Sequence, residues 1–289
     1  MKIAGVQCDV HHGLPERNLT NIEQWFLKAR QGGADLVIFP ECATTGYAFS
    51  TREEAAQLAE PIPGLTTRIL QSLCEKHGGQ IVLGMLEADG DQIYNTACHI
   101  AAVGIVATYR KIHLPYLGVD RVVDFGDRPF SVYENDGLRI GLNICYDAGF
   151  PEVARVLALQ GADLIILPTN WPTGAETLAD HAIVTRALEN GVYYAAINRV
   201  GVERRTQFVG RSRICGPRGE TLAVASADGE EILFAEIDSE RARRKTIVRV
   251  PGEQLIDRIK DRRPEFYGPL LENRGEPRPG HDIPASEFS

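Results

Sequence analysis

The hydrophobic pattern at the start of the chain predicts a strand, a helix and a second strand. Residues 2–9 form a short apolar run. Apolar residues at helical spacing follow over 14–30, until the two glycines at 32 and 33, which commonly end a helix. The next run, 34–41, is continuously apolar at its centre, which is typical of a strand covered on both faces. The chain therefore opens with a β-α-β unit.

The middle of the chain predicts a meander, and the second half alternates strands with helices. A helical stretch over 65–77 ends at two glycines, and strands joined by short turns follow it. The predicted elements from there onward are strands 81–87, 93–101, 105–111 and 138–146, helix 150–160, strand 163–169, helix 175–190, and strands 192–198, 207–215, 221–225 and 231–237.

Two segments of the chain resemble each other. Residues 3–40 and residues 140–168 each contain a strand, a helix, the tripeptide Gly-Ala-Asp, an apolar strand and a proline. This repeat predicts two similar α/β halves whose sheets pack face to face. Reactive residues of α/β sheets gather at the carboxyl ends of strands. The polar residues at such ends are Glu41, Cys145 and Asn170, and Lys111 ends a strand of the meander.

The length and composition predict one large folded domain with a C-terminal extension. The chain has 289 residues, of which 44% are hydrophobic and 24% charged, as in ordinary globular proteins. After Pro251 the sequence becomes rich in Arg, Glu and Pro, with isolated apolar residues. We therefore predict one folded domain over 1–250. The rest of the chain, 251–289, is predicted to be an arm that contacts another subunit.

Charge and hydropathy exclude several classes of partner. The net charge is −8, and no run of Lys and Arg interleaved with aromatic residues compensates for it, which argues against nucleic acid. No apolar run approaches the roughly 20 residues that span a bilayer, and the amino terminus lacks a signal sequence, so we expect a cytoplasmic protein. The six cysteines are scattered without a CxxC pair, which argues against disulfides and a thiolate metal site.

Three residues supply the chemistry that amide cleavage needs, namely a nucleophile, an acid/base and a positive group. Cys145 ends an apolar strand and precedes a turn into a helix, where the backbone N–H of Tyr146 can face an oxyanion. An ammonium and a helix amino terminus nearby would favour its thiolate. Glu41 follows a buried strand, where desolvation would raise its pKa toward that of a general base. Lys111 offers the ammonium.

Each of these residues lies in a longer motif. The motifs are Phe-Pro-Glu41-Cys-Ala-Thr-Thr-Gly-Tyr47, Tyr-Arg-Lys111-Ile-His-Leu-Pro115, Gly141-Leu-Asn-Ile-Cys145-Tyr-Asp-Ala-Gly-Phe-Pro-Glu152 and, further along, Leu167-Pro-Thr-Asn-Trp-Pro172. They resemble those of the nitrilase superfamily of carbon–nitrogen hydrolases, over essentially residues 1–250. The resemblance implies a four-layer α-β-β-α sandwich, a Glu-Lys-Cys triad, no metal or organic cofactor, and a homodimer or larger homo-oligomer.

One position departs from the family pattern. Members often carry a second glutamate after the lysine motif, and the segment 116–126 contains none. Asp120 and Asp124 are the two candidates for a supporting acid in its place. Residues beside the motifs are candidates for the substrate pocket, and equally for packing: Tyr47, His113, Tyr116, Asn170 and Trp171.

The predicted reaction is hydrolysis of a small non-peptide amide through a thioester. In this family nitrile cleavage goes with a Trp-Glu pair after the cysteine, whereas Tyr146-Asp147 resembles the amidase and carbamoylase branches. Hydrolysis of an N-carbamoyl group, nitrile hydrolysis and acyl transfer are alternatives that use the same triad. An oligomeric interaction module without catalysis is the alternative from another class.

Overall fold

The computed structural model describes residues 1–272 and contains two six-stranded sheets. In the first sheet β1, β2 and β3 are parallel and the other pairs are antiparallel; its order is β14 (Glu231–Glu236), β1 (Lys2–Gln7), β2 (Leu36–Ile38), β3 (Gln80–Asp89), β4 (Gln92–Ala101) and β5 (Gly104–Arg110). The last three strands are the predicted meander.

The second sheet repeats this plan. Strands β7, β8 and β9 are parallel and the other pairs are antiparallel. The order is β13 (Thr221–Val224), β12 (Arg213–Cys215), β9 (Tyr193–Ile197), β8 (Leu164–Pro168), β7 (Leu138–Leu142) and β6 (Val132–Asn135). The two β-α-β units detected as a repeat therefore lie in different sheets.

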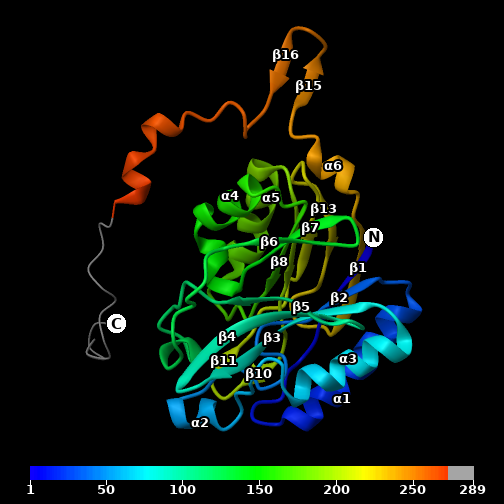
Figure 1. The fold of residues 1–289 in the computed structure, drawn as a ribbon, viewed down its shortest axis with the longest axis vertical. Coiled ribbons are helices and arrows are strands. Elements are labelled where there is room, and N and C mark those ends of the chain that lie inside the picture. Colours follow the sequence, from blue (N-terminus) through cyan, green and yellow to red (C-terminus); the bar gives the residue numbers. More distant parts are fainter. Residues whose placement is uncertain (273–289) are drawn as a thin grey trace. The chain divides into compact units, whose positions relative to one another are not determined.

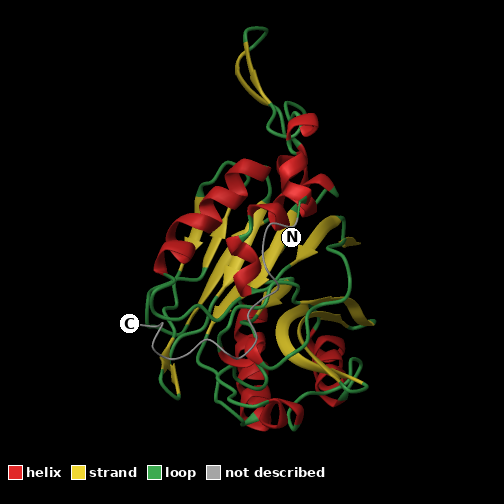
Figure 2. Ribbon diagram, turned by 90° about the vertical axis from the view of Figure 1, so that its left-hand side faces the viewer, coloured by secondary structure: helices red, strands yellow, loops and turns green. Residues whose placement is uncertain are grey.

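Helices cover the outer face of each sheet (Figures 1 and 2). On the first sheet, α1 (Pro15–Gln31) and α3 (Leu65–His77) bury their apolar stripes, with Phe26 and Leu70 in one cluster with strand residues. On the second, α4 (Pro151–Leu159) and α5 (Ile183–Asn190) do the same. The predicted α-β-β-α sandwich is confirmed.

The inner faces of the two sheets form one continuous core. Ile3 and Leu36 of the first sheet belong to the same buried cluster as Ile140 and Leu164 of the second. The sheets approach closely at Gly5, where an added Cβ would lie 2.2 Å from the side chain of Ile197. Because the carboxyl ends of β2 and β8 lie across this interface, polar residues after them can meet.

Several elements differ from the predictions. The predicted strand 207–215 is interrupted: β11 (Thr206–Gln207) pairs with β10 (Val202–Glu203), the backbone is left-handed at Gly210 and Arg211, and β12 begins only at Arg213. The predicted strand 138–146 ends at Leu142, since Cys145–Gly149 form a 3-10 turn. Helix 175–190 opens with a π-helical turn. The short helices α2 (Arg52–Ala56) and α6 (Ser239–Arg243) were not predicted.

The chain divides into two compact units, Met1–Lys245 and a second that begins at Thr246. The second contains a hairpin of β15 (Ile247–Val250) and β16 (Gln254–Ile256), followed by two 3-10 turns, Pro264–Phe266 and Gly268–Leu271. Residues 273–289 of the predicted arm lie outside the described residues. No helix within 1–272 is both long and apolar enough to cross a membrane.

Candidate active site

Four polar side chains of the first half of the chain form a closed ring. Glu41 follows β2 in a turn, Asn95 lies in β4, Lys111 follows β5, and Asp120 belongs to the 3-10 turn Gly118–Arg121. All four have no exposed surface. Strands and loops of the first half therefore bring three charged side chains and one amide together in a buried site.

Lys111 links the two carboxylates. Its Nζ donates to Glu41 Oε1 at 2.6 Å and to Asp120 Oδ2 at 2.5 Å. An ammonium carries one further N–H donor, which these two bonds leave for another acceptor. The predicted pair of Glu41 and Lys111 is thus in direct contact.

Asn95 closes the ring and is a site residue that the sequence reasoning missed. Its Nδ2 donates to Glu41 Oε1 at 2.7 Å and to Asp120 Oδ1 at 2.9 Å. Its backbone carbonyl accepts the N–H of Lys111 at 2.8 Å. The available signal was an amide within an apolar strand of the meander, next to the strand that ends at the lysine motif.

The structure distinguishes the two candidate aspartates. Asp120 also accepts the hydroxyl of Tyr47 at 2.7 Å. Asp124 instead accepts from Arg52 at 2.6 Å and from the backbone N–H of Ile93 at 2.8 Å. Asp120 is therefore the acid that contacts Lys111, and Tyr47 supports it from the loop after Glu41.

Cys145 follows a strand of the second sheet and lies near enough to Glu41 and Lys111 for their charges to act on its thiol. It begins a 3-10 turn with φ of 46°, in the left-handed region that side chains seldom adopt, and it is 5% exposed. Asp147 stabilises this turn by accepting the backbone N–H of Ile144 and the hydroxyl of Tyr109, each at 2.8 Å. The tight turn, rather than a regular strand end, presents the sulfur.

The remaining predicted pocket residues occupy different environments. Asn170 follows β8 and donates from Nδ2 to the backbone carbonyl of Glu41 at 2.8 Å, which ties the two sheets together. Trp171 is 2% exposed. His113 contacts Asp147 at 2.7 Å and its ring lies 3.9 Å from that of Phe150. Tyr116 is 44% exposed.

Burial and neighbouring charges set the protonation of the ring. Burial raises the pKa of Glu41; Lys111 opposes this rise and Asp120 adds to it. Burial alone would lower the pKa of Lys111, but the carboxylates of Asp120 and Glu41 raise it well above its ordinary value. The site therefore holds a permanent ammonium beside a carboxyl group suited to exchange protons.

The surroundings of Cys145 act on the pKa of its thiol in opposite directions. Burial and the carboxylate of Glu41 raise the pKa of this thiol, and Lys111 together with the Thr169 side chain and the Asn170 backbone N–H only partly opposes the rise. The raised pKa favours the protonated thiol, so attack by this sulfur would require a base that takes its proton.

Several buried polar atoms have no hydrogen-bond partner within residues 1–272. Those of Glu41 and of the segment after β8 include Glu41 Oε2, Asn170 Oδ1 and Trp171 Nε1. Buried polar groups are rarely left unpaired in native proteins, so unpaired atoms of this kind commonly serve a ligand or a reaction. The first two of these atoms are acceptors and the third is a donor.

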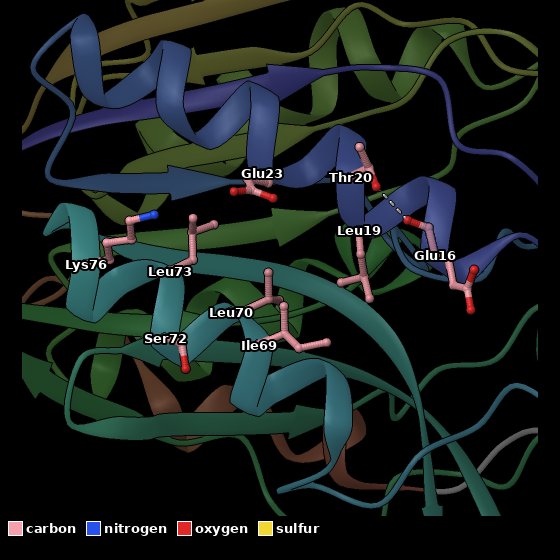
Figure 3. Close-up of a pocket in the computed structure, with 9 residues that line it drawn as sticks. All are labelled: Glu16, Leu19, Thr20, Glu23, Ile69, Leu70, Ser72, Leu73 and Lys76. Atoms are coloured by element: carbon pink, nitrogen blue, oxygen red, sulfur yellow. Dashed lines mark hydrogen bonds between the residues drawn. The ribbon is translucent and has the colours of Figure 1, made fainter.

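A separate groove lies on the outer surface between α1 and α3 (Figure 3). Apolar side chains, among them Leu19, Ile69 and Leu73, form its floor, and Glu16 and Glu23 are charged groups on its α1 side. It contains none of the predicted site residues, so it does not contribute to the triad.

The fold and the site together define an enzyme of the carbon–nitrogen hydrolase class. The model of the family named Carbon-nitrogen hydrolase matches residues 2–245. The chain belongs to this family, within the nitrilase superfamily, and it is a hydrolase of C–N bonds.

Similar proteins carry both nitrilase and amidase names. A protein named nitrilase from Pyrococcus abyssi is 41% identical over 268 residues, covering 92% of this chain and 99% of that protein. A 2-oxoglutaramate amidase from Bacillus subtilis is 31% identical, covering 82% of this chain and 90% of its own. The crystal structure of an amidase from Nesterenkonia sp. has a TM-score of 0.78 at 25% identity, covering 94% and 96% of the two chains.

Proposed function

We propose that this enzyme hydrolyses small non-peptide amides through a thioester on Cys145, with Glu41 as general acid/base and Lys111 as the positive group. The observation that carries the proposal is the buried contact between Glu41 and Lys111, with Cys145 brought beside both by a left-handed turn. Covalent catalysis by a thiol needs this combination of nucleophile, base and electrophilic stabiliser.

The first half of the reaction forms the thioester. Glu41 takes the Cys145 proton at Oε2 as the sulfur attacks the amide carbonyl carbon. The carbonyl oxygen gains negative charge, which the remaining N–H of Lys111 and the backbone N–H of Tyr146 stabilise. Glu41 then transfers this proton to the amide nitrogen, the C–N bond breaks, and ammonia or an amine leaves.

The second half releases the acid. Glu41 removes a proton from a water molecule, whose oxygen attacks the thioester carbonyl. The C–S bond breaks, the Cys145 sulfur recovers the proton from Glu41, and the carboxylic acid departs. One glutamate therefore acts as base in each attack and as acid in each departure, and Lys111 stabilises both oxyanions.

An amide is favoured over a nitrile by the residues after the cysteine. Asp147 is buried and bonded to Ile144, Tyr109 and His113, so it shapes the nucleophile turn. The unpaired Asn170 Oδ1 and Trp171 Nε1 are an acceptor and a donor that match the N–H and C=O of an amide. Tyr47, His113 and Tyr116 would then be walls of the pocket.

We also propose that the enzyme works as a homodimer or larger homo-oligomer without a metal or organic cofactor. The proposed steps use groups of the chain itself and water. The second unit offers apolar residues for a contact between copies, with Leu255 60% exposed and Phe266 68% exposed.

The test is a panel of matched substrates. Each acyl group is offered as primary amide, nitrile and N-carbamoyl compound, and ammonia, carboxylic acid and carbon dioxide are measured. We expect amide turnover by the native enzyme and none by Cys145→Ala. Faster nitrile turnover, carbon dioxide release, or acyl transfer to added amines would each replace the amidase assignment by the corresponding alternative. No turnover at all would favour the interaction module.

A further inference from the structure

Asn95 bonds to both carboxylates of the site, yet the mechanism above gives it no role. Its Nδ2 donates to Glu41 Oε1 and to Asp120 Oδ1. A side-chain amide has two N–H donors on one nitrogen, so these two bonds use both. Its Oδ1 faces the thiol of Cys42, with Sγ at 3.8 Å, which agrees with this orientation of the amide.

We propose that Asn95 is a positioning residue that, with Lys111, fixes Glu41 Oε1 and reserves Oε2 as the oxygen that exchanges protons. Oε1 receives bonds from both residues, at 2.7 Å and 2.6 Å. Oε2 is buried and has no partner within the described chain. A rotation of the carboxylate away from this plane would break both bonds, so the two donors keep one of its oxygens at the unpaired Oε2 position. The inference rests on the proposed function, since Asn95 would position the residue proposed there as the general base.

The backbone of Asn95 adds a second constraint. Its carbonyl accepts the N–H of Lys111, so the pairing of β4 with β5 fixes the start of the lysine side chain. The side chain of the same residue fixes the carboxylates that the lysine ammonium contacts. One residue therefore determines the distance between the base and the positive group, and effects of misplacement on a reaction of this kind are large.

Asn95 also stabilises an excess of negative charge. The ring holds two carboxyl groups and one ammonium in a buried site, and the donors of Asn95 favour the ionised form of Glu41. Its removal would raise the pKa of Glu41 further. The titratable groups that face Glu41 are Lys111, Asp120, Cys145, Tyr47 and Cys42.

The experiment compares Asn95→Ala and Asn95→Asp with a matched control on the same strand. Thr96 is equally buried, and its hydroxyl donates to Glu87 at 2.6 Å without touching the ring. We expect kcat to fall about 10- to 100-fold in Asn95→Ala, the range for hydrogen bonds to charged groups, with little change in KM. The acid limb of the pH profile should move to higher pH. Thr96→Val should leave kcat and the limb at their native values.

A second measurement requires no substrate. The rate at which iodoacetamide alkylates Cys145 is recorded against pH in the native protein and in the three variants Asn95→Ala, Asn95→Asp and Thr96→Val. Mass spectrometry identifies the modified cysteine. Because Glu41 accepts the thiol proton, Asn95→Ala should shift this profile to higher pH, and Thr96→Val should not. Asn95→Asp, which replaces the donors by an acid of the same shape, should be the more impaired of the two.

The outcomes separate the two proposals. If the native enzyme turns over no amide but the alkylation profile shifts in Asn95→Ala, the positioning role stands and the amidase assignment fails. If amides are hydrolysed but both pH profiles of folded Asn95→Ala coincide with the native ones, the positioning role is overturned. Equal shifts in Thr96→Val would also overturn it, since they would indicate a general loosening of β4.

Discussion

The two similar halves of the molecule each place a cysteine after their first strand, and the two thiols differ in what surrounds them. Counted from that strand, Cys8 of the first half corresponds to Cys145 of the second. They are 4% and 5% exposed. Burial, the largest effect in both, raises the pKa of Cys8 to about 12 and that of Cys145 above its ordinary value. Neither burial nor thiol acidity distinguishes them.

The neighbours make the difference. Cys8 lies near Glu230, Arg199 and Asp9. Cys145 lies near Glu41 and Lys111, which come from the opposite sheet, and it alone of the two cysteines has a left-handed backbone. In the proposed mechanism, the packing of the two sheets is therefore what gives a strand-end cysteine its base and its ammonium.

The largest expected effect separates these cysteines directly. Cys145→Ala should lower kcat/KM by about 10⁴-fold or more, since removal of a covalent nucleophile leaves only binding and oxyanion stabilisation. Cys8→Ala should keep native kcat and lose about 1–2 kcal/mol of unfolding free energy, the cost of a small cavity. Amide turnover and urea unfolding measure the two. A Cys8→Ala enzyme that folds but loses turnover would contradict the assignment of the nucleophile.

The next effect concerns the base. Glu41→Gln keeps the shape of the side chain but cannot accept the thiol proton, so kcat should fall by about 10²- to 10⁴-fold. In the native enzyme Glu41 must be ionised to act, and its pKa is raised by burial. Activity should therefore rise with pH above the range of an ordinary glutamate. A native acid limb in the ordinary range would show that another group sets the profile.

A smaller effect distinguishes the two aspartates. Asp120→Asn removes a negative partner of Lys111 and should lower kcat about 10- to 100-fold. Asp124→Asn weakens a partly exposed pair with Arg52, worth about 1 kcal/mol or less, and should keep native kcat. Steady-state kinetics with the same amide compares them. Equal losses of kcat in the two variants would mean that the contact of Asp120 with Lys111 does not contribute specifically to activity.

The sequence was sufficient for the parts of this site that depend on local pattern. Glu41, Lys111 and Cys145 each follow an apolar run, and their motifs predicted the sandwich. Asn95 could not be assigned in the same way, because a lone asparagine within a strand acquires its role only when the turn at Gly118–Arg121 brings Asp120 to it. Its position depends on contacts between residues far apart in the chain.

The protonation of the Cys145 thiol also could not be inferred from the motifs alone. Lys111 lowers the pKa of Cys145, as the sequence predicted, but burial and the carboxylate of Glu41 raise it by more. The strand boundaries failed for a related reason. Apolar composition over 207–215 indicated one strand, whereas Phe208 forms an isolated β-bridge with Pro172 and the backbone is left-handed at Gly210 and Arg211. Burial alone does not tell a strand from a packed loop.

The smallest expected effect tests how closely each half packs its helix. Four residues before each cysteine, the first half has Ala4 and the second has Gly141. A Cβ on Gly141 would lie 2.9 Å from the side chain of Leu157 in α4, so Gly141→Ala should cost about 1–3 kcal/mol of unfolding free energy. Kinetics per folded molecule should stay native, because neither residue contacts the triad.

A double-mutant cycle identifies the cause of that cost. Leu157→Val shortens the side chain that an added methyl would meet, so Gly141→Ala should cost less in this background than in the native one. The reverse change in the first half, Ala4→Gly, removes a methyl that its helix accommodates and should cost about 1 kcal/mol through backbone entropy. Additive costs in the cycle would show that the contact with Leu157 is not the cause of the cost at Gly141.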